Sequence, residues 1–282
     1  MSQRPERGQL VLDHIAHWVP DPAAAAAALA DLGFCVTPFS AQSVGDPPIP
    51  AGTGNHCVML EGGYLEFLAP IADTPNAATL RAGIARYTGV HLIAFGTVDP
   101  AGDQARLQAN GFAPLEPVAL RRPIETPDGF REARFTVVRT KPGVMEEGRV
   151  QFVEQHTPEH LWQARWLRHK NGATRLKRVE ICVADPHAAV LRYAAYTGLA
   201  PIRIDDAPGL ATARGTLVFR DPSATERRLG VAPPGLPWIA GYALATPPGS
   251  ASRSVVLPAS LGGVLLFEST DDPANEIPTD GA

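Results

Sequence analysis

The 282-residue sequence has few cysteines, no long apolar run and no large excess of charge of either sign. Its three cysteines are scattered without a CxxC pair, which argues against a disulfide framework and favours a reducing cytoplasm. No apolar run approaches the roughly 20 residues of a membrane span, and the polar N-terminus lacks the apolar core of a secretory signal. A net charge of -4 gives no basic field that would attract a nucleic acid.

Proline (28 residues) and glycine (26 residues) are instead abundant. They divide the chain into many short elements, which favours strands and turns over long helices. Hydrophobic residues make up 45% and charged residues 19%, so the chain can bury a core and disorder as a whole is excluded. The length suggests one large or two ordinary domains.

One pattern occurs three times: a strand, an Asp-Pro helix start, a helix that ends at glycine, and further strands. The first copy predicts a strand over residues 10–19, a helix over 23–32, and strands over 34–39, 56–60 and 64–68. The second predicts a strand over 89–95, a helix from 99 to 107, and strands over 112–120, 132–139 and 149–155. The third predicts a strand over 176–184, a helix over 187–196 and a strand over 201–205. Possible strands follow over 215–219, 238–245, 255–258 and 264–268.

The sequence therefore predicts an α+β protein of tandem βαβββ modules. Unit one spans residues 8–72 and unit two residues 88–157, and together they form a paired module over 8–160 with a cupped mixed sheet. Residues 173–270 are expected to hold a degenerate third module, which packs on the first pair or serves as a dimer element. The stretches 73–88 and 157–173 are expected to be linkers.

Short motifs within these units resemble the vicinal oxygen chelate superfamily, and in particular its glyoxalase-like domain families. The motifs are LDHI at 12–15, GTGN at 52–55, YLEFL at 64–68, FVEQHTP at 152–158 and HKNGA at 169–173. The superfamily includes glyoxalase I, extradiol dioxygenases and small resistance proteins that bind antibiotics. The resemblance implies the glyoxalase/dihydroxybiphenyl dioxygenase-like fold, in which two units pair into a cup.

The resemblance also implies a divalent metal held by His14, Glu66, His91 and Glu154, with the two glutamates as catalytic groups. Strand side chains alternate between faces, so one residue from each strand can point into a shared hollow. Two imidazoles and two carboxylates suit Zn, Ni, Co, Mn or Fe(II) without distinguishing among them. Glu66 also stands on an otherwise apolar strand, where a buried carboxylate needs a partner.

The spacing leaves alternatives open at several positions. His14 precedes Asp21 by seven residues and His91 precedes Asp99 by eight, so Leu92 competes with His91 unless a bulge intervenes. A one-residue shift in register would likewise replace Glu154 by Gln155 or His156. In the third copy, the position of His14 is taken by Arg178, so no metal is expected there.

Three residues are candidates for substrate binding. Asn55, in the Gly-rich stretch, could donate a hydrogen bond to a ligand, although such turns also use these residues for their own backbone. Arg121 and Arg122 could clamp a carboxylate or phenolate, or could simply keep a strand edge charged.

The leading expectation is a metal-dependent glyoxalase-like lyase or isomerase that acts on a small molecule with vicinal oxygens. The metal would stabilise a developing oxyanion, and a glutamate would move a proton. The alternatives are an extradiol-type dioxygenase and a metal-free protein that binds a small molecule. A cytoplasmic homodimer without nucleic-acid or membrane partners is expected.

Overall fold

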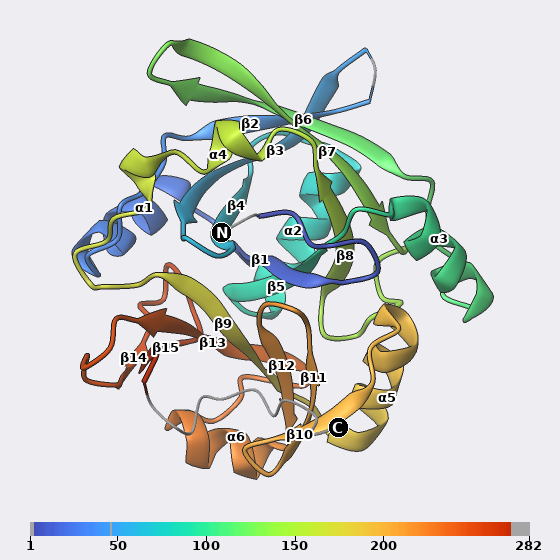
Figure 1. Ribbon diagram of the computed structural model, residues 1–282, viewed down its shortest axis with the longest axis vertical. Helices are drawn as coiled ribbons and strands as arrows, with labels where there is room; N and C mark the ends of the chain where they lie inside the picture. The colour runs from blue at the N-terminus through green and yellow to red at the C-terminus, as the bar shows by residue number, and fades with distance from the viewer. Residues whose placement is uncertain (1–2, 46, 272–282) are drawn as a thin grey trace.

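The computed structural model describes residues 3–45 and 47–271. Figure 1 shows the first half of the chain as a ring of strands, with the C-terminal half packed beneath it. The ring consists of two successive βαβββ units, and a further helix joins the first unit to the second. Their elements are β1 (Val11–Trp18), α1 (Pro22–Asp31), β2 (Ser40–Val44), β3 (Ile49–Met59), β4 (Tyr64–Pro70), α2 (Pro75–Arg86), β5 (Gly89–Gly96), α3 (Pro100–Ala109), β6 (Val118–Thr126), β7 (Gly129–Arg139) and β8 (Arg149–Gln155).

The first eight strands close on themselves. Their order is β1-β4-β3-β2-β6-β7-β8-β5, and β5 also pairs with β1. In each unit the first strand runs parallel to the last, β1 with β4 and β5 with β8, whereas β1 and β5 are antiparallel. The two units are thus related like two halves of a cup, which confirms the predicted α+β fold of paired βαβββ modules.

The Asp-Pro pairs begin helices as the sequence predicts. Asp21 accepts hydrogen bonds from the backbone of α1, and Asp99 from that of α3, each with proline at the start of the helix. Such a carboxylate satisfies backbone N–H groups that have no partner within the helix. The predicted linker 73–88 is instead mostly the helix α2, because Thr74 and Pro75 provide the same kind of start.

The two faces of the ring bury different side chains. Residues such as Ile15, Leu65 and Ile93 pack on the outer face beneath the helices. Ala16, Leu68, Leu92 and similar residues form a second cluster on the inner face. Because side chains alternate along a strand, each strand contributes to both clusters. Polar side chains on the inner face of the ring therefore point into the same hollow as this second cluster.

The C-terminal half repeats the arrangement more fully than a single degenerate module. A complete βαβββ unit (β9 to β12) is followed by a shorter one (β13 to β15) that has no helix after its first strand. The elements are α4 (Pro158–Leu161), the 3₁₀ turn η1 (Ala164–Trp166), β9 (Arg175–Cys182), α5 (Pro186–Thr197), β10 (Pro201–Ile204), β11 (Ala207–Ala211), β12 (Thr216–Arg220), α6 (Pro222–Leu229), β13 (Trp238–Thr246), β14 (Arg253–Val256) and β15 (Val264–Ser269).

These units join the ring through the sheet and the core. β13 pairs with β9 along its length and touches β5 at a single residue pair, Ile239 with Val90. The predicted linker 157–173 contains α4 and η1. Within the described residues, no helix is both long and apolar enough to cross a membrane.

Candidate functional site

Asp13 and His14 are consecutive residues of β1 that lie side by side in the interior. The pairing of β1 with β5 shifts between Leu12 and His14, so Asp13 is the extra residue of a β-bulge. Oδ1 of Asp13 lies 2.6 Å from Nδ1 of His14 and accepts a 3.2 Å hydrogen bond from Gln155 Nε2 on β8. Both side chains are buried, so this pair is a fixed part of the interior.

Glu66 faces His14 from the adjacent strand β4. Oε1 of Glu66 accepts hydrogen bonds from Asn55 and, at 3.0 Å, from Gln42. Oε2 lies 3.9 Å from His14 Nε2, which is too far for a direct hydrogen bond. Tyr64 stacks on the imidazole with ring centroids 4.3 Å apart. His14 is therefore held by Asp13 on one nitrogen and presents the other toward Glu66.

The contact with Asp13 selects the tautomer of His14. An ionised carboxylate only accepts hydrogen bonds, so Nδ1 of the imidazole carries the proton. In the neutral ring, Nε2 is then left with a lone pair on the Glu66 side. This arrangement is suited to general acid–base chemistry, because a proton gained at Nε2 leaves an imidazolium next to the Asp13 carboxylate.

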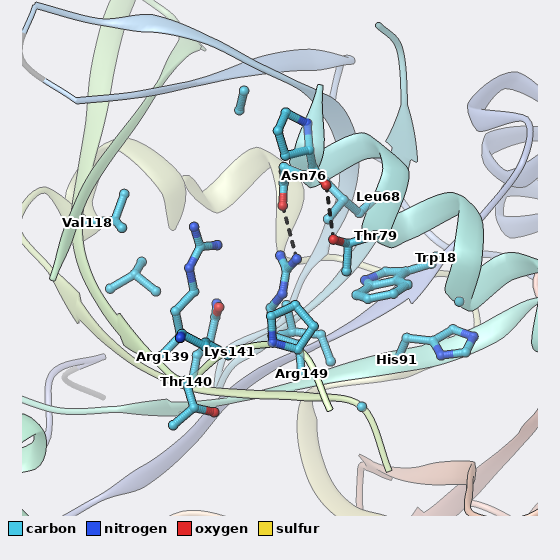
Figure 2. A pocket seen from close by; sticks show the side chains of 18 of the residues that line it. Trp18, Leu68, Asn76, Thr79, His91, Val118, Arg139, Thr140, Lys141 and Arg149 are labelled. Atoms are coloured by element: carbon cyan, nitrogen blue, oxygen red, sulfur yellow. Dashed lines mark hydrogen bonds between the residues drawn. The ribbon is translucent and has the colours of Figure 1, made fainter. Parts of the chain in front are cut away.

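A cavity of about 630 Å³ opens inside the ring, with Glu66 in its wall. Its size is within the roughly 300–1,000 Å³ of sites that hold small molecules. Trp18, Leu68 and Val118 form part of its apolar lining, while Arg139 and Arg149 supply positive charge (Figure 2). Glu66 thus borders a space that is large enough for a small organic ligand, and Nε2 of His14 lies 3.9 Å from its carboxylate.

His91 is not brought to this group. On β1 and β5, Ala16 pairs with Leu92 and His17 with Val90, so His91 is a bulged residue between them. Its ring stacks on Trp18 and on Tyr87, and its Nε2 donates to the Tyr87 carbonyl at 2.7 Å. Burial lowers the pKa of His91 to about 4. Its place is an aromatic stack at the edge of the cavity, where it is neutral at physiological pH (Figure 2).

Leu92, and not His91, takes the place in unit two that His14 takes in unit one. His14 pairs with Ala94 and Ala16 pairs with Leu92 across the antiparallel strands. An approximate twofold axis relates the two units and exchanges these two residue pairs. It therefore places Leu92 at the position in unit two that His14 holds in unit one. Leu92 precedes Asp99 by seven residues, which is the interval from His14 to Asp21, so His91 corresponds to Asp13 and not to His14.

The same relationship identifies Gln151 as the counterpart of Glu66. Glu66 pairs with Ala16 on the parallel strands of unit one, and Gln151 pairs with Ala94 on those of unit two. Unit two therefore offers a leucine and an amide at the two positions where unit one offers an imidazole and a carboxylate.

Glu154 is also separated from His14 and Glu66. It lies next to Gln155, whose side chain turns inward to Asp13, and strand alternation sends Glu154 to the opposite face. There it forms a 3.1 Å ion pair with Arg4. His156 is exposed and shares a 2.8 Å hydrogen bond with Thr136. Among the three alternatives at this strand end, the structure directs Gln155 inward.

These positions test whether the expected metal fits. His14 and Glu66 supply one imidazole and one carboxylate, whereas a protein site for such an ion commonly uses three or four ligands of these types. In the described part of the chain, no three His, Cys, Asp or Glu side chains are grouped so as to hold a metal ion. The donor set therefore does not fit the expected quartet.

The three candidate substrate-binding residues lie in different surroundings, because neighbouring residues of a strand point to opposite faces. Asn55 belongs to the group around Glu66, as described above. Arg122 is buried, with a guanidinium nitrogen 3.5 Å from Cys57 Sγ. Burial raises the pKa of the Cys57 thiol to about 11, so the thiol stays protonated at neutral pH. Arg121 turns to the other face, where Glu132 is 3.9 Å away.

In the third unit, ion pairs occupy the region that corresponds to the His14 group. Arg178 is buried on β9 and binds the carboxylates of Glu180 and Glu268. Lys177 and Arg228 also contact Glu268. The charges of this cluster are therefore paired with one another.

Several residues of the site were missed by the sequence analysis. Gln42 holds the carboxylate of Glu66, and Arg139 and Arg149 line the cavity. Gln155, which holds Asp13, was named only as an alternative to Glu154. The alternation of Arg149, Gln151 and Gln155 on one face of β8 was the available signal. A sequence gives no information about which strand faces them, so their partners could not be assigned.

The ring of paired βαβββ units, with an imidazole and a carboxylate in its interior, defines a protein of the vicinal oxygen chelate fold. The family model described as "Glyoxalase-like domain" matches residues 12–197. The chain therefore belongs to the glyoxalase-like domain family. No curated protein sequence matches the chain significantly.

Solved structures share the fold at low sequence identity. A hypothetical protein from Staphylococcus aureus has a TM-score of 0.66 and 13% identity, covering 92% of this chain and 99% of that one. A mutant of 4-hydroxymandelate synthase from Streptomyces coelicolor has a TM-score of 0.51 and 17% identity, over 84% of this chain and 71% of that one. At these identities the likeness shows the fold alone.

Proposed function

We propose that the protein is an enzyme of the vicinal oxygen chelate type that moves a proton on a small molecule with adjacent oxygen atoms. The observation that carries this proposal is the buried line Asp13–His14–Glu66 beside the cavity. His14 is the general base, Asp13 positions it, and Glu66 is the second proton-transfer group. This is lyase or isomerase chemistry, without a step that depends on a metal.

In the proposed reaction, Nε2 of His14 takes a proton from the carbon next to a carbonyl group. The electron pair of the broken C–H bond moves into the substrate, and its negative charge develops on the carbonyl oxygen. The proton then returns to a neighbouring atom of the substrate, either directly from His14 Nε2 or after Nε2 has passed it to the Glu66 carboxylate. Asn55 and Gln42 hold Glu66 in position, and Asp13 stabilises the imidazolium.

The other activities considered from the sequence need groups that this interior does not combine. A metal-dependent glyoxalase or an extradiol dioxygenase would draw ligands from unit two, at the positions held by Leu92 and Gln151. The iron site of such a dioxygenase would require two imidazoles and one carboxylate. The arrangement in unit one therefore favours proton transfer by the protein's own side chains.

The test is exchange of carbon-bound hydrogen in D₂O. Purified protein is incubated with methylglyoxal, 2-oxo acids and 2-hydroxy ketones, and deuterium uptake is followed by NMR while the metal content of the same sample is measured. We expect exchange on at least one compound without stoichiometric metal, and a loss of roughly 100-fold or more in His14→Ala.

His187→Ala, on the exposed start of α5, is the matched control and should exchange like the wild type. Exchange that is unchanged in His14→Ala would refute the assignment of the base. Binding of a compound without any exchange across the panel would favour a small-molecule binding protein. Homodimer formation and a cytoplasmic location stay predictions.

A further inference from the structure

Arg139 and Arg149 bring two positive charges into one cavity. Arg139 ends β7 and Arg149 begins β8, and these adjacent antiparallel strands place the two arginines near each other. Figure 2 shows both guanidinium groups extending into the same space. Arg149 donates a 3.0 Å hydrogen bond to Asn76 Oδ1, and its guanidinium carbon lies 5.4 Å from the centre of the Trp18 ring.

Neither group forms an ion pair with a carboxylate of the described residues. Burial, together with the positive charge of Arg139, lowers the pKa of Arg149 to about 10, and the negative charge of Glu66 only partly opposes this. Burial also lowers the pKa of Arg139. Holding two like charges partly out of water is unfavourable, and an anion between them would remove that cost.

Several other buried or partly buried arginines of this chain form ion pairs with carboxylates. Arg178 binds Glu180 and Glu268, and Arg192 binds the buried Glu147. Arg139 and Arg149 differ from these, because Glu66 and Glu146 share the cavity wall with them but neither arginine forms an ion pair within the described residues. Guanidinium groups bind carboxylates and phosphates through paired hydrogen bonds.

Apolar side chains line the same cavity. Leu92 and Val137 contribute to it from the inner face of the ring, and Trp18 lies under the Arg149 guanidinium. Inorganic anions would leave these surfaces uncovered. An organic anion would cover them, with its charged group at the arginines and its apolar body along the wall.

We propose that Arg139 and Arg149 form a binding site for the carboxylate or phosphate group of a small organic anion. This inference names the substrate class of the proposed function and rests on it for what happens at His14. Glu66 lines the same cavity, so a molecule anchored at the arginines can extend its reacting carbon toward the Asp13–His14–Glu66 group.

Calorimetry on the full-length protein tests the site with phenylacetate, phenyl phosphate, inorganic phosphate and the uncharged phenylacetamide. We expect at least one aromatic anion to bind on the order of tenfold or more tightly than phenylacetamide and than inorganic phosphate. Phenylacetate and phenyl phosphate then distinguish the carboxylate from the phosphate. Equal binding of the amide and both aromatic anions would overturn the proposal, and this comparison needs no variant.

Variants test whether the anion binds at these two arginines. Arg139→Gln and Arg149→Gln should each weaken the preferred anion by roughly tenfold or more. Arg131→Gln, at an exposed position of the same strand β7, should leave the affinity unchanged. Anion affinity that is equal in all three variants would refute the site.

His14→Ala separates this inference from the proposed function. Retained anion binding with lost deuterium exchange supports both. If the wild type binds anions but does not exchange hydrogen, the anion site stands and the catalytic proposal is refuted. If it exchanges hydrogen on uncharged ketones and shows no preference for anions, the catalytic proposal stands and the anion site is refuted.

Discussion

The Nδ1 atom of His14 and the Oδ1 atom of Asp13 lie 2.6 Å apart, although the two residues are neighbours in a strand. In a regular strand, consecutive side chains point to opposite faces. The bulge between Leu12 and His14 removes that separation and gives the imidazole a fixed orientation. The proposed proton transfer depends on this local irregularity of β1.

Asp13→Asn should lower the rate of deuterium exchange by roughly 100- to 10,000-fold. The amide can donate to Nδ1 and so favour the wrong tautomer, and it no longer stabilises the imidazolium. A positioning role requires that kcat falls and the pH profile shifts while KM stays nearly constant. Asp31→Asn, at an exposed position of α1, is the control, and an unchanged kcat in Asp13→Asn would contradict the role.

Leu92→His combined with Gln151→Glu should create a divalent metal site that the wild type lacks. The two changes restore an imidazole and a carboxylate at the unit-two counterparts of His14 and Glu66. Four such ligands suit a tetrahedral or open octahedral ion. Metal analysis and the visible spectrum with Co(II) should show about one equivalent bound. If His91→Ala abolished that binding, the assigned register would be wrong.

His17 should make the protein less stable in mild acid. It is fully buried, its Nδ1 contacts the Leu261 carbonyl oxygen at 2.8 Å, and burial lowers its pKa to about 4 from 6.5. The unfolded chain therefore binds a proton between pH 6.5 and 4 that the folded chain does not. Stability is full above pH 6.5 and falls by roughly 3 kcal/mol as the pH drops through this window.

His17→Asn should flatten this dependence, because its amide can still donate to Leu261 but does not titrate. Urea unfolding at pH 7.5 and pH 4.5 measures the difference in stability for each protein. His187→Asn, exposed on α5, should leave the difference as in the wild type. His91 adds a similar dependence, so the slope decreases without vanishing. An unchanged slope in His17→Asn would contradict the burial of a neutral imidazole.

Arg178→Met should destabilise the C-terminal half by about 3 kcal/mol, because two buried carboxylates lose a direct partner. These are Glu180 and Glu268. Arg203→Met, which removes an exposed pair with Asp206, should cost less than about 1 kcal/mol. Denaturant unfolding of both variants makes the comparison. Equal, small losses would mean that the Arg178 cluster is not held out of water.

Much of the fold is predictable because its signals are local. Each Asp-Pro pair supplies a helix cap within three residues, and Gly198 ends α5 in a left-handed conformation that glycine adopts easily. The alternation around Glu66 places it inside once the strand is recognised. The helix α6 was not predicted although Asp221 and Pro222 supply the same kind of start. The division of the later strands into a complete third unit and a shorter fourth one depends on how those strands pair, which the sequence does not show.

The sequence by itself determined the repeated units, their helix starts and the presence of His14 and Glu66 in strands, since each depends on residues close in the chain. The tertiary structure decided which side chains meet. Bulges at Asp13 and His91 arise only when β1 pairs with β5, and they bring Asp13 to His14 while turning His91 away. Whether Arg139 and Arg149 have counter-charges likewise depends on strands that pack around them from distant parts of the sequence.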